Sequence, residues 1–349
     1  MNEPRRQHRK TLRDFTLRAN FTLTDTTLAL LGASGSGKSM TLKCIAGLET
    51  PDRGQIVLNG RTLYDSSAGV NLPPQERSVG YLFQNYALFP NMTVRENIIF
   101  ALDRSREEKE RILAENVARF SLEGIENAYP ARLSGGQQQR AAFARILARG
   151  ADLLLLDEPL SALDPHLKWQ IETALREILM GQNIAAILVT HDRDEAFRIA
   201  QEIATVDRGQ LTPPMDRHEL FRSPGTCAGA RLTGCKNISA ARRLDATHIE
   251  ATDWGITLAV TDDVTDAHHI AIRAHYFVPA QKDGENVFPA QIVEMIESTF
   301  SMIVMLRFAD GAHLVRWEVD KPAWEALHVS ENVSLRICFP PDALMLLRD

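Results

Sequence analysis

A glycine-rich segment between an apolar run and a helical segment is the strongest constraint on the fold of this chain. The run Thr27–Leu31 has the character of a buried strand, and residues 40–46 have a helical composition. A loop in this context binds the phosphates of a nucleotide. The expected nucleotide contacts are Gly32, Ala33, Ser34, Gly35, Ser36, Gly37, Lys38, Ser39 and Met40. The predicted fold is therefore an α/β fold of the P-loop NTPase type.

The residues of this loop suit different parts of a nucleotide. Glycines let backbone N–H groups converge on phosphate oxygens, and the N-terminus of the following helix favours negative charge. We expect Lys38 to contact the β- and γ-phosphates of ATP. The hydroxyl of Ser39 is the expected ligand of Mg²⁺.

Two further apolar runs, Leu153–Leu156 and Ala185–Val189, end close to polar side chains. In an open parallel sheet, ligands gather at the carboxyl ends of the strands. We expect Asp157 to hold Mg²⁺ through water, Glu158 to polarise the attacking water, and His191 to reach the γ-phosphate or to orient Glu158. A structural Asp-Glu turn and a structural histidine are the alternatives.

The sequence Leu133-Ser-Gly-Gly-Gln137 precedes a helical pattern from Gln137 to Arg149. Serine and glycine at a helix start can present backbone N–H groups to an anion. The same residues also suit an ordinary capped helix. The segment thus predicts a helix N-terminus, and its ligand stays open at this point.

Together these motifs resemble the ATP-binding subunit of an ATP-binding cassette (ABC) transporter. The resemblance implies an ATPase that works as a homodimer, in which the signature residues contact the nucleotide held by the other copy. Those residues are Ser134, Gly135, Gly136 and Gln137. It also implies that Ser161–Asp164 crosses between the two sites and that Gln84 senses Mg²⁺ at a hinge to a helical insert. No aromatic adenine contact is assigned, because Phe15 and Phe21, the aromatics before the loop, lie in strand-like surroundings.

Composition and turn signals predict two domains. With 349 residues and 44% apolar content, the chain can build two cores. Turn-forming residues gather between Gly209 and Gly234, which predicts an ATP-binding domain over 1–230, with a helical subdomain over about 85–150. Strand-length segments follow, and they predict an all-β domain over 236–349 that resembles the small OB-like (TOBE) accessory barrel of such importers.

Charge, hydropathy and cysteine usage exclude several classes of protein. A net charge of -6 argues against nucleic acid as the main partner. No apolar run reaches the roughly 20 residues of a membrane-spanning helix. The four cysteines form no Cys-x-x-Cys pair and suit a reducing compartment. Any membrane contact is therefore expected to go through a partner.

The segment Asn85–Asn97 resembles importer ATPases, in which the helical insert receives a helix of the permease. Its apolar side chains, Tyr86, Leu88, Phe89 and Met92, either form that socket or belong to the core of the insert. The resemblance implies a peripheral subunit at the cytoplasmic face of the cell membrane, which works with transmembrane permease subunits and, indirectly, with a separate solute-binding protein.

A narrower resemblance, carried by Ile56–Asp65, is to the molybdate and sulfate importers. It implies an oxyanion cargo such as molybdate, sulfate or tungstate. Spermidine or putrescine, iron and sugar are the alternative cargoes. A non-transport ABC ATPase acting on ribosomes or DNA is the alternative class. The tail either senses an anion or stiffens the dimer.

Overall fold

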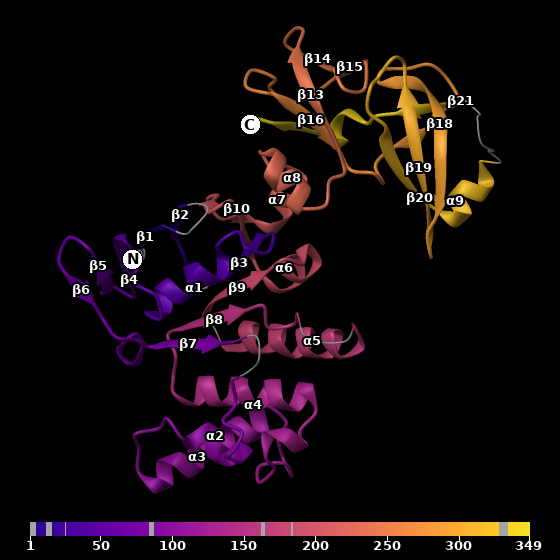
Figure 1. Ribbon diagram of the computed structural model, residues 1–349. Helices are drawn as coiled ribbons and strands as arrows, with labels where there is room; N and C mark the ends of the chain where they lie inside the picture. Colours follow the sequence, from indigo (N-terminus) through magenta and orange to yellow (C-terminus); the bar gives the residue numbers. More distant parts are fainter. Residues whose placement is uncertain are drawn as a thin grey trace. The chain divides into compact units, whose positions relative to one another are not determined.

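A twelve-stranded sheet organises residues 1–217, the first of the two units into which the contacts of the computed structural model divide the chain (Figure 1). The structure describes residues 5–11, 16–24, 26–83, 87–161, 165–182, 184–327 and 334–349. Five neighbouring strands of the sheet are parallel. In spatial order they are β10 (Glu202–Asp207), β3 (Thr27–Gly32), β9 (Ala185–Thr190), β8 (Leu153–Asp157) and β7 (Val79–Leu82).

The three apolar runs of the sequence are β3, β8 and β9, and the parallel arrangement predicted for them is confirmed. Their side chains are almost all buried, because both faces of these strands are covered and neither face contacts solvent. They share one core with α1 (Lys38–Ala46). The central strands therefore form a rigid base for the loops that follow them.

Further strands extend the sheet on the β10 side into a wing whose pairs are antiparallel except for β11 with β2, which is parallel. They are β11 (Gln210–Leu211), β2 (Thr16–Thr22), β1 (Arg5–Thr11), β4 (Arg53–Leu58), β5 (Arg61–Asp65) and β6 (Val70–Asn71), while β12 (Met215–Asp216) pairs with β10. Phe21 is 4% exposed in the core beneath this wing, so its ring is unavailable for stacking on adenine. Phe15 lies outside the described residues.

Three helices form the insert between β7 and β8, and they pack on one another: α2 (Val94–Ile99), α3 (Arg106–Arg119) and α4 (Gly135–Ala148). Phe120, which follows α3, stacks on Phe143 of α4 with ring centroids 6.5 Å apart. The helix predicted from Gln137 begins two residues earlier, because the side chain of Ser134 caps it. Two more helices, α5 (Pro165–Gln182) and α6 (Arg193–Ile199), flank β9 in the sequence.

Residues 218–349 form the second unit, and the all-β character predicted for the tail is confirmed in two antiparallel five-stranded sheets. One contains β13 (Asn237–Arg243), β14 (His248–Ala251), β15 (Ile256–Ala259), β16 (His269–Ile272) and β22 (Leu344–Leu347). The other contains β17 (Val278–Pro279), β18 (Val287–Glu297), β19 (Ser301–Phe308), β20 (Val315–Asp320) and β21 (Ser334–Cys338). Both contribute to one core, which includes Trp254, Trp317 and Phe339.

Helices α7 (Arg217–Arg222), α8 (Cys227–Leu232) and α9 (Lys321–Ala326) accompany these sheets. The contacts divide the chain between Arg217 and His218, and Cys227 and Ala230 of α8 pack against Ala271 and Leu347 of the tail. Residues 218–230, which the sequence analysis placed with the first domain, are therefore described with the second unit.

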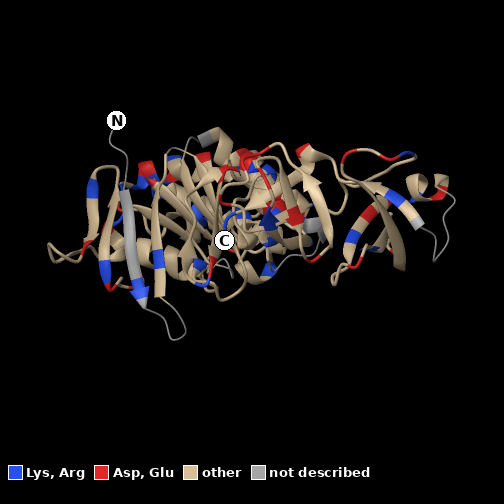
Figure 2. Ribbon diagram, turned by 90° about the horizontal axis from the view of Figure 1, so that it is seen from above, with Lys and Arg blue, Asp and Glu red and all other residues tan. Residues whose placement is uncertain are grey.

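Basic and acidic residues are interspersed along the ribbon in Figure 2. The net charge of -6 is therefore not the product of one acidic segment. Within the described ranges, no helix has both the length and the apolar content that crossing a bilayer demands.

Candidate active site

The sheet order brings the loops that follow three strands, β3, β9 and β8, to one edge. Residue Leu31 of β3 lies opposite Thr190 of β9, and Val189 of β9 lies opposite Asp157 of β8. Because these strands are parallel and in similar register, the segments that leave their carboxyl ends start side by side. The phosphate loop, His191 and the Asp157-Glu158 pair are thus neighbours, although more than a hundred residues separate the loop from the other two in the sequence.

The phosphate loop is shaped by two glycines. Gly37 precedes α1 with φ 106°, a conformation that side chains disfavour. A Cβ at Gly32 would lie 2.3 Å from the carbonyl oxygen of Val206, so the strand can approach β10 only with glycine there. In the described part of the chain, the buried Oγ of Ser36 has no hydrogen-bond partner. The loop therefore carries a polar atom that a phosphate oxygen can satisfy.

Lys38 is 3% exposed and lies against the loop that it follows. Its Nζ donates hydrogen bonds of 2.8 Å to the carbonyl oxygens of Gly32 and Ala33. Burial lowers the pKa of Lys38, while the nearby carboxylates of Glu158 and Asp157 oppose that change. A buried cation at the start of α1 is a suitable partner for phosphate charge. The side chain of Met40, in contrast, packs on the core behind the loop.

Asp157 links the phosphate loop to the neighbouring strands. Ser39 Oγ donates a 2.7 Å hydrogen bond to its Oδ1, and Tyr81 Oη of β7 donates a 2.8 Å hydrogen bond to its Oδ2. A serine hydroxyl and a carboxylate are hard oxygen ligands, so this pair fits Mg²⁺. The sequence analysis did not single out Tyr81, whose position in an alternating strand gave no chemical signal. Gln84, the other predicted contact of Mg²⁺, lies outside the described residues.

Glu158 and His191 are paired at the ends of β8 and β9. The distance from His191 Nδ1 to Glu158 Oε2 is 3.5 Å, and both side chains are partly exposed. Glu158 has φ 48°, an unusual value for a residue with a side chain, and its backbone N–H donates to Val189 at 3.1 Å. Such strain is typical of functional residues. The arrangement can orient a water molecule through the carboxylate and the imidazole together.

A polar network between the end of β9, α5 and α6 holds the segment around His191, and the sequence analysis missed it. Thr190 Oγ1 donates to Glu195 at 3.0 Å, and Asp192 caps α6 through the N–H groups of Asp194 and Glu195. Lys168 of α5 bridges Asp192 and Glu195 with distances of 2.5 and 3.7 Å. Burial raises the pKa of Glu195 to about 7, although Lys168 and Thr190 act in the opposite direction.

The Ser134 segment forms a capping box at the start of α4. Ser134 Oγ accepts from the Gln137 N–H at 3.3 Å, and Gln137 Oε1 accepts from the Ser134 N–H at 2.9 Å. Helix α4 packs on α2, α3 and β7, whereas α1 packs on β3, β8 and β9. Among the described residues, no hydrogen bond or ion pair joins Ser134, Gly135, Gly136 or Gln137 to the phosphate loop. The start of α4 is therefore separate from the phosphate loop of the same chain.

Helix α4 nevertheless touches the segment that follows the catalytic candidates. Fully buried Gln139 donates a 3.4 Å hydrogen bond to the carbonyl oxygen of Pro159, directly after Glu158. Ser161 Oγ donates to the carbonyl oxygen of Glu158 at 3.0 Å. Residues 162–164, including the predicted crossing residue Asp164, lie outside the described ranges.

An apolar groove of about 450 Å³ lies between the insert and β7. Its exposed aromatics are Phe83, Phe89 and Phe100, which are 37%, 39% and 57% exposed. The rings of Phe89 and Phe100 lie 4.8 Å apart, and the guanidinium of Arg145 lies 5.3 Å from the Phe89 ring. Of the socket candidates, Phe89 lines the groove, Leu88 and Met92 are half-buried, and Tyr86 is outside the described residues.

Comparison with known proteins gives matches for both units. Residues 18–161 match the family model described as ABC transporter. The chain is 35% identical over 301 residues to a sulfate/thiosulfate import ATP-binding protein of Thermosynechococcus vestitus, covering 84% of each chain. It is 36% identical to a spermidine/putrescine import ATP-binding protein of Rubrobacter xylanophilus, over 88% of this chain and 83% of that one.

A third relative and one solved structure agree with these matches. An Fe(3+) ions import ATP-binding protein of Pectobacterium atrosepticum is 43% identical over 57% of each chain. A dimeric ATP-binding cassette solved in a post-hydrolysis state with ADP and Pi matches with a TM-score of 0.51 and 27% identity. That match covers 62% of this chain and 99% of the solved one.

Proposed function

Because this chain belongs to the ATP-binding subunits of ABC importers and is an ATPase of that family, we propose that it powers the uptake of a small oxyanion. The proposal that the chain hydrolyses ATP at this site is supported by one observation: Lys38, Asp157, Glu158 and His191 lie together at one edge of the sheet. The sequence match to a sulfate/thiosulfate import protein supports the oxyanion part.

In the proposed reaction, Lys38 exchanges its bonds to the loop carbonyls for bonds to the β- and γ-phosphate oxygens of ATP. Glu158 accepts a hydrogen bond from the attacking water, and the one N–H of neutral His191 either orients that carboxylate or donates toward the γ-phosphate. Mg²⁺ held by Ser39 and Asp157 would neutralise negative charge on the phosphate oxygens. Placing these groups before ATP arrives lowers the entropic cost of ordering the reactants.

A second copy of the chain completes each site in this proposal. Ser134, Gly135, Gly136 and Gln137 form a helix start that is apart from the phosphate loop of their own chain; Ser134 is exposed, Gly135 and Gln137 are half-buried, and Gly136 is buried. Such an N-terminus favours an anion, so it suits the γ-phosphate held by the partner copy. The dimeric solved relative with ADP and Pi supports this arrangement. ATP would then close the dimer, and hydrolysis would open it.

The groove beside Phe83, Phe89 and Phe100 is the proposed contact for a permease. Exposed aromatics around an apolar hollow suit a short amphipathic helix of a partner protein. The hydrogen bond from Arg145 of α4 to the Ala87 carbonyl, 2.6 Å long, ties this groove to the helix that starts at Ser134. We place the protein at the cytoplasmic face of the membrane, bound to permease subunits and served by a separate solute-binding protein.

Molybdate, sulfate and tungstate are the proposed cargoes, and polyamine or iron is the second candidate, which the two other relatives favour. The test is ATPase activity of the full transporter in proteoliposomes, with each solute and its binding protein added in turn. Stimulation by one of the oxyanions supports the proposal, and stimulation by spermidine or Fe³⁺ alone overturns the cargo assignment. Co-sedimentation with ribosomes instead of membranes would contradict transport itself.

A further inference from the structure

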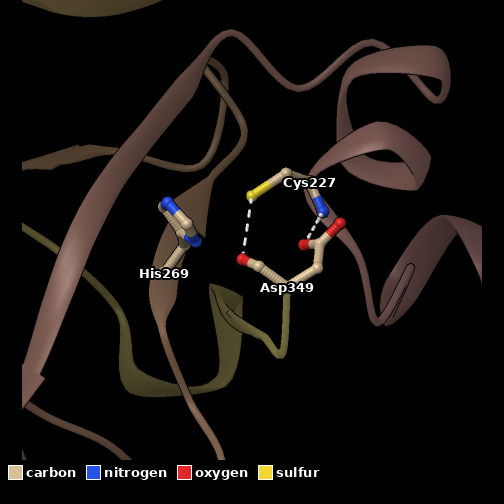
Figure 3. Close-up of side chains that lie close together, drawn as sticks. All are labelled: Cys227, His269 and Asp349. Atoms are coloured by element: carbon tan, nitrogen blue, oxygen red, sulfur yellow. Dashed lines mark hydrogen bonds between the residues drawn. The ribbon is translucent and has the colours of Figure 1, made fainter.

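Three side chains that commonly bind transition metals converge in the second unit. Cys227 begins α8, His269 begins β16, and Asp349 follows β22. The sulfur, one imidazole nitrogen and one carboxylate oxygen all lie within 4.8 Å of one another. Figure 3 shows the three residues close together, with the carboxylate of Asp349 directed at the backbone nitrogen of Cys227. None of them belongs to the ATP site.

The sheet and α8 hold these residues together. In the antiparallel pair of β16 and β22, His269 lies opposite Leu347, so the chain that leaves β22 passes beside the imidazole. The N–H of Cys227 donates a 2.6 Å hydrogen bond to Asp349 Oδ1, and the N–H of Arg348 donates to the Gly225 carbonyl at 3.0 Å. The arrangement is therefore anchored by backbone contacts on both sides.

Two observations point to a ligand at this place. The Nδ1 atom of His269 is buried and, within the described ranges, has no hydrogen-bond partner. An unsatisfied buried polar atom costs roughly 1–3 kcal/mol, and a bound cation would supply its missing partner. Cys227 is 8% exposed, and its sulfur lies 3.9 Å from the carbonyl oxygen of Asp349, which is a long contact for a hydrogen bond. Within the part of the chain that the structure describes, the imidazole nitrogen lacks a partner and the thiol makes only this long contact.

We propose that Cys227, His269 and Asp349 bind a zinc-like transition metal ion. A thiolate combined with imidazole selects Zn²⁺ and its chemical neighbours over Mg²⁺ and Ca²⁺, which take oxygen ligands. Neighbouring ligand atoms on tetrahedral Zn²⁺ lie roughly 3.5 Å apart, so side-chain rotations close the present spacing. The thiol releases its proton to solvent as the metal–sulfur bond forms, and water takes the fourth position.

The metal would join three segments that are far apart in the sequence. It would tie α8 to the edge of the β16–β22 pair and so hold residues 227–232 on the tail. A ligand that binds only the folded state stabilises that state more as the ligand concentration rises. The stability of the second unit would then respond to the supply of metal.

The test uses the full chain, free of affinity tags, titrated with Co²⁺ as a spectroscopic substitute for Zn²⁺. We expect one Co²⁺ per chain to produce a thiolate-to-metal charge-transfer band in the near ultraviolet, and Zn²⁺ to remove it by displacement. This band separates the site from the oxygen ligands Ser39 and Asp157, which cannot give it. A titration of the wild-type chain without the band overturns the proposal.

Variants assign the ligands. Cys227→Ser should abolish the band, and His269→Gln and Asp349→Asn should each weaken binding by more than about tenfold, since outer-shell changes alone cost roughly 10–100-fold. His268→Gln, at the exposed neighbour of His269, and Cys338→Ser are the matched controls and should behave as wild type. Circular dichroism shows whether each variant folds. If Cys227→Ser does not fold, the metal affinities of His269→Gln and Asp349→Asn test the assignment. A band that survives Cys227→Ser or disappears in Cys338→Ser contradicts the assignment.

Discussion

Tyr81 and Asp157 share a 2.8 Å hydrogen bond between Oη and Oδ2, so a tyrosine on β7 holds the carboxylate that closes β8. The opposite oxygen of the same carboxylate accepts from Ser39. Burial, followed by the hydrogen bond and charge of Asp157, raises the pKa of Tyr81, so the phenol stays a donor. Both carboxylate oxygens are thus oriented by the protein, which prepares Asp157 for its proposed role toward Mg²⁺.

The substitution Tyr81→Phe tests this contact. Removing the hydroxyl leaves Asp157 Oδ2 without its donor, and we expect a loss of about 1 kcal/mol in the free energy of unfolding. Urea unfolding followed by fluorescence measures it. Tyr129→Phe, at a tyrosine 47% exposed, is the control and should change stability little. Equal midpoints for wild type and Tyr81→Phe would show that the hydrogen bond contributes nothing.

Glu158→Gln tests the water-polarising role. The amide cannot accept the proton, so we expect ATP turnover to fall by at least about 100-fold while ATP still binds. With ATP, the variant should elute as a dimer in size-exclusion chromatography, because the dimer closes on ATP and cannot reopen without hydrolysis. Glu177→Gln, on the exposed face of α5, is the matched control. Unimpaired turnover in Glu158→Gln would refute the assignment.

Lys38→Ala separates nucleotide binding from catalysis. The buried ammonium is the cation of the phosphate loop, and its loss should weaken ATP binding together with turnover. A fluorescent ATP analogue titrated into the full chain gives the affinity. Lys43→Ala, on the same helix and half-buried, should keep that affinity. An unchanged affinity in Lys38→Ala would show that the lysine acts only in the chemical step.

Glu195 predicts a pH dependence of stability. Burial raises its pKa from 4.5 to about 7, so the folded protein binds more protons than the unfolded chain between these values. The contribution of Glu195 to the free energy of unfolding is therefore fully present below pH 4.5. It is lost as the pH rises to about 7, and the loss is on the order of 2–3 kcal/mol. In urea unfolding from pH 5 to 8, the free energy of unfolding of Glu195→Gln should increase relative to that of the wild type as the pH rises. Glu123→Gln is the exposed control, and a pH-independent difference would contradict the expectation.

Arg77 tests the anchoring of α1, the helix that carries Lys38 and Ser39. It is 1% exposed, and its guanidinium donates to the carbonyl oxygens of Cys44 and Ile45 at the end of α1 and to Leu72 and Asn71. Arg77→Met leaves these acceptors unpaired, so we expect a loss of about 3 kcal/mol. Arg132→Met, at an exposed position, should cost under about 0.5 kcal/mol. A similar small loss for Arg77→Met would show that water replaces the guanidinium.

Much of the catalytic unit could be predicted because its strands are continuous apolar runs that end in motif residues. The runs at β3, β8 and β9 were found correctly, since a strand buried on both faces leaves an unmistakable pattern. The capped helix start at Ser134 is confirmed, whereas the helical pattern alone, which begins at Gln137, is two residues late because periodicity does not mark a cap. Tyr81 and the Lys168–Asp192–Glu195 network were missed because their partners lie on other elements.

The sequence by itself determined the order of the motifs, the strand–loop–helix around Lys38 and the β-rich character of the tail. These are local properties, which spacing and side-chain type encode directly. Only the tertiary structure decided that β9 lies between β3 and β8, which sets His191 against Glu158, and that Ser134 starts a helix on a separate layer. The meeting of Cys227, His269 and Asp349 was equally hidden, because long-range strand pairing follows from the packing of the whole core.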